Sequence, residues 1–258
     1  MRVTELDLVH LNARFEGAPP LELLRFVSAT FGFRAALLSS MQKAGTALCY
    51  LADRAALSFD VLFVDTGVLH VETIHTRDEL ARTHPNLRVI TLYPDHSFAE
   101  QTRQEGLLYL SKEGQERCCY LRKSLPLRRV KGRYDALISA LRRGEGGARA
   151  KVQPFGLDPE MGALRVHPFH ALSNDELEEL VSRPGLVLNP LHEMGYPTIG
   201  CFPCTTPVLP NEPERAGRWR HLANVTYCGI NPVDRGKDDD VGIDLDDRYR
   251  VALFGGSA

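Results

Sequence analysis

The sequence has little of what marks membrane, secreted or nucleic-acid-binding proteins. No uninterrupted apolar run approaches the ~20 residues that span a bilayer, and the N-terminus lacks the basic, apolar and small-residue layout of a secretory signal peptide. Neither sign of charge is in excess, since 31 basic side chains stand against 33 acidic ones. We therefore expect a cytoplasmic protein that binds neither membranes nor nucleic acids, and in which any anion site is local.

Cysteines are few, and the sequence has no internal repeat and no low-complexity tract. Six cysteines in a reducing compartment serve more often as metal ligands, nucleophiles or buried thiols than as a disulfide framework.

The 258 residues are enough to bury a full core, and the composition turns acidic and irregular after Cys228. We expect one domain over residues 1–228 and a C-terminal tail over residues 229–258, with a short strand at 249–254.

Apolar, partly β-branched runs alternate with helix-like segments in the first half of the chain. This alternation is typical of an α/β fold with an open, mostly parallel sheet and helices on both faces. The predicted strands lie at 35–39, 61–65, 87–93 and 136–140. A helix is predicted at 46–57, in which Cys49 belongs to the apolar pattern and is expected in the core.

Polar loops follow these strands at the edge where open parallel sheets bind ligands. The loop at 40–45 leads into a helix, whose first amides can hold phosphate. The residues that we expect in this crevice are Ser39, Ser40, Lys43, Asp65, Thr66 and Gly67. The stretch 142–149 is rich in glycine and arginine, and we expect a mobile connection, without a helix or strand of its own, that acts as a lid.

Four of the cysteines form two close pairs. Cys201 and Cys204 stand in a C-x-x-C turn, which lets both thiolates reach one metal or one cluster edge. Cys118 and Cys119 are neighbours, which cannot easily form a disulfide with each other but can both ligate a compact cubane. An iron–sulfur cluster is the favoured interpretation, and a structural zinc site or a metal-free group of buried thiols stays open.

The sequence around the cysteines resembles the [4Fe-4S] type of adenylyl-sulfate reductase, a relative of the phosphoadenylyl-sulfate reductases. The resemblance covers roughly residues 35–228. The matching motifs are C-C-x-[IL]-R-K at Cys118 to Lys123, the run Gly195 to Thr205 with Asn189-Pro190-Leu191-His192 before it, R-x-G-R-W at Arg215 to Trp219, and D-T-G at Asp65 to Gly67 with Glu72-Thr73 after it. The resemblance implies an adenine-nucleotide alpha-hydrolase-like fold with a [4Fe-4S] cluster on Cys118, Cys119, Cys201 and Cys204.

The resemblance also implies a reaction. A cysteine near the C-terminus, here Cys228, attacks the sulfur of adenylyl sulfate, AMP leaves, and thioredoxin or a similar reductant releases sulfite from the S-sulfocysteine. Lys123 is expected beside the cluster, and a homo-oligomer is allowed. The arginines at the family's nucleotide-contacting positions are Arg142, Arg143, Arg215 and Arg218.

Several departures from the family bear on the substrate. The first loop has Lys43 where an acidic side chain is usual, and Tyr227 and Asn231 replace glutamate and histidine beside Cys228. Two alternatives to an adenylyl-sulfate reductase therefore stay open. One is a relative that uses the same cluster and crevice on another nucleotide or sulfur substrate, and the other is a cluster-bearing binding protein without turnover.

Overall fold

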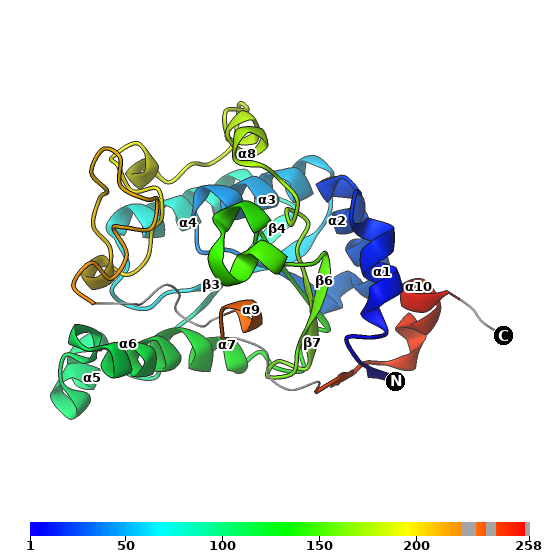
Figure 1. The fold of residues 1–258 in the computed structure, drawn as a ribbon, viewed down its shortest axis with the longest axis horizontal. Coiled ribbons are helices and arrows are strands. Elements are labelled where there is room, and N and C mark those ends of the chain that lie inside the picture. Colours follow the sequence, from blue (N-terminus) through cyan, green and yellow to red (C-terminus); the bar gives the residue numbers. More distant parts are fainter. Residues whose placement is uncertain (223–230, 236–240, 256–258) are drawn as a thin grey trace.

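A six-stranded sheet with helices on both faces forms the centre of the fold (Figure 1). The computed structural model describes residues 1–222, 231–235 and 241–255. The strand order is β4-β3-β2-β5-β7-β6, in which only the β6–β7 pair is antiparallel. The strands are β2 (Ala35–Leu38), β3 (Phe59–Val64), β4 (Leu87–Leu92), β5 (Ala136–Ser139), β6 (Phe155–Asp158) and β7 (Ala163–Val166).

The mostly parallel α/β fold and its first four strands are confirmed, within one or two residues at each end. Strands β6 and β7 were not predicted, because each has only four residues and each carries one charged side chain. These two charges neutralise each other inside the protein: Arg165 Nε donates to Asp158 Oδ2 at 2.8 Å, and both side chains are buried.

Helices pack on each face of the sheet because neighbouring strand residues point to opposite sides. Leu37 and Ile138 belong to the large core under helices α2 and α3, whereas Ala36 and Leu137 pack with Leu127 of α7 on the other face. The helices are α1 (Leu8–Phe15), α2 (Pro20–Phe31), α3 (Lys43–Arg54), α4 (Val71–Thr83), α5 (Phe98–Glu105), α6 (Lys112–Cys119), α7 (Leu125–Arg128), α8 (Asn174–Val181), α9 (Pro232–Arg235) and α10 (Arg250–Phe254).

The two ends of the described chain lie side by side. Strand β1 (Arg2–Val3) pairs antiparallel with β8 (Ile243–Asp244), and Tyr249 and Leu253 pack into the same core as α2. The predicted strand at 249–254 is wrong: this segment is the end of a short 3-10 turn followed by α10, because its buried residues, Tyr249 and Leu253, recur at a helical spacing. The domain boundary at residue 228 lies outside the described residues and stays a prediction.

The glycine-rich stretch 142–149 contains regular structure, so the expectation of a connection without an element is wrong. It forms two short 3-10 helices, Arg143–Glu145 and Gly147–Lys151. Gly146 and Gly147 have φ values of 69° and 57°, which glycine adopts readily, and this lets the chain turn between the two helices.

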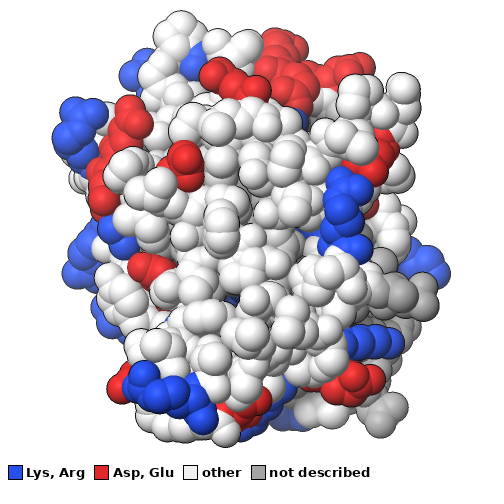
Figure 2. All heavy atoms as spheres, turned by 90° about the vertical axis from the view of Figure 1, so that its left-hand side faces the viewer, with Lys and Arg blue, Asp and Glu red and all other residues white. Residues whose placement is uncertain are grey.

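Figure 2 shows the end of the molecule where α5, α6 and the segment around residues 195–215 lie. Uncharged side chains fill the centre of this face, and basic and acidic side chains alternate around its rim among the residues drawn as described. Over the described ranges, no helix combines the length and the apolar character that crossing a membrane requires.

Candidate active site

A pocket of about 260 Å³ opens at the carboxyl ends of the parallel strands. It collects the loops after β2, β3 and β5 together with the segments around residues 192–200 and 214–219. Seven of the ten residues predicted to bind substrate line it: Ser39, Ser40, Lys43, Thr66, Arg142, Arg215 and Arg218. Lys123, expected beside the cluster, belongs to the same lining. Asp65, Gly67 and Arg143 do not belong to this lining.

The first loop is held by its neighbours. A Cβ on Gly45 would lie 2.7 Å from Ser39 Oγ, so a larger residue there would displace the Ser39 side chain. His192 Nε2 accepts from the backbone N–H of Lys43 at 3.0 Å, while its Nδ1 lies 2.9 Å from Tyr196 O. Burial, with the Lys43 charge, lowers the pKa of His192 to about 4, so the ring is a neutral acceptor at the start of α3 at neutral pH.

Lys43 and Gln42 have different partners. The Lys43 ammonium forms an ion pair with Glu178 on α8, so its charge is partly compensated at the pocket rim. Gln42 accepts from the N–H of Ile199 at 2.8 Å and donates to Ser40 Oγ at 2.9 Å, which joins the first loop to the segment before Cys201. Gln42 was not predicted, because nothing local in the sequence indicates a partner 157 residues away.

The neighbouring residues Arg142 and Arg143 have different surroundings. Arg142 is 5% exposed and lines the pocket, where Nη1 donates to Asn174 Oδ1 at 2.8 Å. Its Nε is buried without a hydrogen-bond partner among the described residues. Arg143 instead pairs with Glu16, at 2.8 Å between Nη2 and Oε2, and donates to Val152 O. The structure therefore directs Arg143 away from the pocket.

Arg218 and Trp219 form one corner of the pocket. The guanidinium carbon of Arg218 lies 4.3 Å from the centre of the Trp219 ring, which is a cation–π distance. Trp219 is 2% exposed, and its φ of 49° lies in the left-handed region, which is strained for a bulky residue. Its backbone N–H donates to Cys204 O at 3.0 Å, so this corner is tied to the C-x-x-C turn.

The four paired cysteines line a second, smaller cavity. Cys118, Cys119, Cys201 and Cys204 share its wall with Lys123, Arg218 and Trp219, which also line the larger pocket. A π-helical turn, Tyr120–Ser124, follows the two neighbouring cysteines, as is common at functional sites. Cys49 lies in the core, where burial raises its pKa to about 12.

Polar side chains surround the sulfur atoms. Gln115 Nε2 donates to Cys119 Sγ at 3.0 Å, and Thr66 Oγ1 lies 3.3 Å from Cys201 Sγ. Burial, with the neighbouring Cys201, raises the pKa of Cys204 to about 11. Within the described residues, no three histidine, cysteine, aspartate or glutamate side chains converge as a single metal ion requires. The four thiols therefore line one cavity without meeting at a single point.

Arg149 and Glu145 line the pocket and were not predicted: Glu145 pairs with Arg149, whose other partner, Asp234, lies 85 positions away. Cys228, predicted as the nucleophile, lies outside the described residues.

The sequence of this chain resembles those of known proteins. The phosphoadenosine phosphosulfate reductase domain matches residues 34–207. Adenosine 5'-phosphosulfate reductase of Streptomyces coelicolor is 39% identical over 84% of this chain and 89% of its own. The enzyme of the same name from Rhodococcus opacus is 35% identical over 88% and 96%, respectively.

Among solved structures, phosphoadenylyl-sulfate reductase from Candida auris, crystallised as a phosphate complex, superimposes with a TM-score of 0.68. The match covers 80% of this chain and 99% of that one at 18% identity, which shows the fold. By the extent of the domain match and the identity to its relatives, the chain belongs to the phosphoadenosine phosphosulfate reductase domain family.

Proposed function

We propose that this chain reduces adenosine 5'-phosphosulfate to sulfite and AMP. The observation that carries the proposal is the common wall between the two cavities: Lys123, Arg218 and Trp219 line both the large pocket and the cysteine cavity. An anionic ligand in the large pocket would therefore lie next to a group bound by the cysteines. The relatives that are 35–39% identical carry the name of this activity.

The cysteine cavity fits a [4Fe-4S] cluster. Four thiols line one cavity and could each ligate one iron of a cubane, and amide and hydroxyl groups of Gln115 and Thr66 contact two of the sulfur atoms. Cys118, Cys119, Cys201 and Cys204 would hold the cluster, which would supply a charged group that orients and polarises the neighbouring substrate. Lys123 would stand between the cluster and the substrate.

The substrate has a sulfate joined to the phosphate of AMP, so its reactive end is anionic. Guanidinium groups suit such oxygens, and Arg142, Arg215 and Arg218 are all in the pocket lining. The buried Nε atoms of Arg142 and Arg218 have no hydrogen-bond partner among the described residues, so both N–H groups could donate to a bound ligand. Ser39, Ser40 and Thr66 add hydroxyl groups. The contacts of Arg143 do not support a substrate role for it.

The reaction would begin at Cys228, whose assignment rests on its position nine residues after Trp219. The thiolate would attack the substrate sulfur, the S–O bond to AMP would break, and the protein would carry a cysteine S-sulfonate. A dithiol reductant of the thioredoxin kind would then attack the Cys228 sulfur, release sulfite and finish as a disulfide. A reducing, cytoplasmic location belongs to the same proposal, because this cycle needs a free thiol.

The decisive experiment is mass spectrometry of the protein after incubation with adenosine 5'-phosphosulfate and no reductant. We expect an added mass of about 80 Da, one sulfo group, that disappears with thioredoxin as sulfite is released. Cys228→Ser should abolish the adduct and still bind AMP, whereas Cys49→Ser should form the adduct normally. A wild-type protein that binds AMP and never acquires the adduct would refute the proposed reaction. Parallel incubation with phosphoadenylyl sulfate tests the choice of nucleotide.

A further inference from the structure

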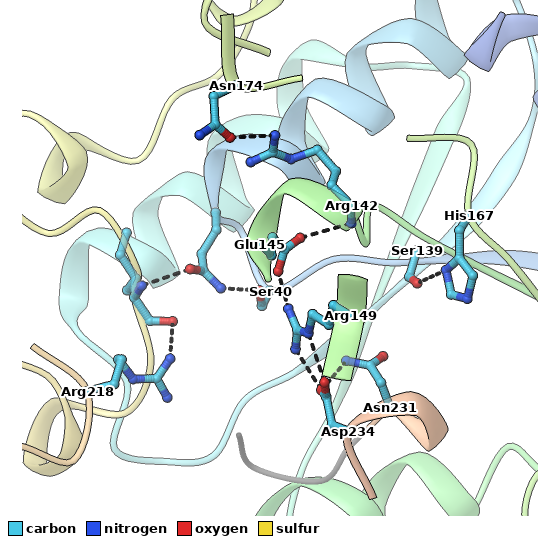
Figure 3. A network of polar contacts seen from close by, with 12 residues as sticks. Ser40, Ser139, Arg142, Glu145, Arg149, His167, Asn174, Arg218, Asn231 and Asp234 are labelled. Atoms are coloured by element: carbon cyan, nitrogen blue, oxygen red, sulfur yellow. Dashed lines mark hydrogen bonds and ion pairs between the residues drawn. The ribbon is translucent and has the colours of Figure 1, made fainter. Parts of the chain in front are cut away.

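A buried ion pair joins the C-terminal segment to the pocket wall. Arg149 Nε and Nη2 donate to the two carboxylate oxygens of Asp234 at 2.8 and 2.6 Å, in the two-pronged geometry shown in Figure 3. The Asp234 side chain is fully buried and that of Arg149 is 12% exposed. The contact connects the 3-10 helix Gly147–Lys151 to α9, 85 residues further along the chain.

The pair places Asn231 at the pocket. Asn231 Nδ2 donates to Asp234 Oδ2 at 3.2 Å, and Asn231 lines the pocket together with Arg149 and Glu145 (Figure 3). Asp234 therefore has two hydrogen-bond partners. One is Arg149, and the other is Asn231, which lines the pocket. No other described residue beyond position 219 belongs to the pocket lining.

Arg149 is suited to be an anchor and is a poor donor for a ligand anion. Its guanidinium also pairs with Glu145, so two carboxylates compensate its single charge. Burial opposes the charged form, but the hydrogen bonds and charges of Asp234 and Glu145 outweigh it and raise the pKa of Arg149 above its usual range. A guanidinium held this way stays ionised, and its contacts fix Asp234 in place.

We propose that Arg149 and Asp234 are positioning residues that hold Asn231 in the wall of the pocket, so that the C-terminal segment completes the nucleotide site. The identity of the ligand rests on the proposed function, whereas the anchoring itself does not. Asn231 stands three residues after Cys228 in the sequence, so loss of the anchor is also expected to slow the reaction of that thiol.

The test compares Asp234→Asn and Asn231→Ala with Glu16→Gln in the full-length protein. Glu16 pairs with Arg143, next to the same glycine-rich stretch but outside the pocket, so its variant controls for a general loosening of residues 142–151. We expect Asp234→Asn and Asn231→Ala to weaken AMP binding in calorimetry five- to tenfold or more. Glu16→Gln should bind AMP as the wild type does. With adenosine 5'-phosphosulfate as substrate, Asp234→Asn should raise KM, a change that Glu16→Gln should not share.

A second measurement keeps the anchor testable without any ligand. Hydrogen–deuterium exchange of a peptide covering residues 231–235 should become at least tenfold faster in Asp234→Asn than in the wild type. Unchanged exchange in this peptide would overturn the anchor. Unchanged AMP affinity in a folded Asp234→Asn protein would overturn the role of the anchor in the pocket. Tighter AMP binding would also overturn this role, because it would mean that the Asp234 carboxylate competes with the ligand for Arg149.

These outcomes are separate from the fate of the proposed reaction. A wild-type protein that binds AMP but forms no sulfo adduct would refute the reaction and leave the anchor standing. If Asp234→Asn does not fold, Asn231→Ala still carries the affinity test, because it removes the side chain in the pocket and leaves the Arg149–Asp234 pair in place.

Discussion

The Arg218 guanidinium stacks on the Trp219 ring at 4.3 Å, and both side chains belong to the wall that separates the substrate pocket from the cysteine cavity. The ring limits the directions in which the guanidinium can point, and Arg218 Nη1 also lies 3.4 Å from Ile199 O. A cation held in this way is oriented before a ligand arrives, which lowers the entropic cost of binding an anion.

The fit of Arg218 depends on Gly200. A Cβ at this position would overlap the Arg218 guanidinium, with the distance to Nε only 3.0 Å and those to Cζ and Nη2 shorter still. We expect Gly200→Ala to displace Arg218 and to weaken AMP binding about 10- to 100-fold, the range for losing one charge-assisted contact of roughly 1.5–3 kcal/mol. Calorimetry on Gly200→Ala and Arg218→Ala should give similar losses.

Gly17→Ala is the matched control, because a Cβ there meets nothing within 4 Å and the backbone is not in the left-handed region. It should bind AMP normally. A Gly200→Ala protein with wild-type affinity would mean that Arg218 does not contribute to binding from its observed position.

We expect the cysteine cavity to bind an iron–sulfur cluster. Protein purified without oxygen should be brown and contain close to four irons and four inorganic sulfides per chain, since four thiols around a cavity suit a cubane. Cys204→Ser should lose the colour, and Cys49→Ser should keep it because Cys49 lies in the core, away from the cavity. Stoichiometric zinc without sulfide would contradict the cluster and favour a structural metal site.

Because two histidines are buried in their neutral form, we expect acid to lower the free energy of unfolding. Burial, followed by the charge of Lys43 for His192 and of Arg165 for His167, lowers their pKa values to about 4 and about 3. An unfolded histidine titrates near 6.5, so between that pH and the folded pKa values the unfolded chain binds protons that the folded chain does not. Their contribution to the free energy of unfolding should therefore fall as the pH drops from about 6.5 to about 4.

His192→Gln isolates one of these groups. It removes one site that takes up a proton on unfolding in this pH window. The slope of the free energy of unfolding against pH should therefore decrease by about 1.4 kcal/mol per pH unit, the value for one proton. Urea unfolding at pH 4.5, 5.5 and 7.5 measures it. An unchanged slope would mean that His192 is protonated in the folded protein as it is in the unfolded chain.

The sequence predicted the part of the fold that local pattern controls. Strands β2 to β5 and the crevice at their carboxyl ends followed from apolar runs that alternate with helices. Strand β7 was missed because the Arg165 charge interrupts the pattern, and only its partner Asp158 on β6 makes its burial tolerable. The end of the chain was predicted as a strand because an apolar run of this length fits either a strand or one helical turn.

The candidate site was predictable where a motif carries it and unpredictable where distant residues pair. The paired cysteines and the corner at Arg218 and Trp219 could be named from the sequence. The outward direction of Arg143 depends on Glu16, 127 residues earlier, and the anchoring of Asn231 depends on Arg149. Such pairs form only when the sheet brings their segments together, and no local pattern of residues indicates them.

Lys43 offers a test of how the first loop handles charge. Its ammonium is paired with Glu178 on α8, although the residue lines the pocket. Because this partner already compensates the charge, Lys43→Gln should change the affinity for AMP less than twofold. Glu178→Gln should free the ammonium for an anionic ligand and tighten AMP binding two- to fivefold, the scale of about 0.5–1 kcal/mol for a partly exposed charge.

The double variant completes the cycle. Lys43→Gln combined with Glu178→Gln should return to the affinity of Lys43→Gln alone, because the gain from removing Glu178 acts only through the ammonium. The gain should also shrink as salt rises from 50 to 500 mM, since the pair lies at the pocket rim, where Glu178 is more than half exposed. Tighter binding that persists in the double variant would assign the effect to Glu178 itself, as a carboxylate that repels the ligand, and would leave Lys43 without a part in nucleotide binding.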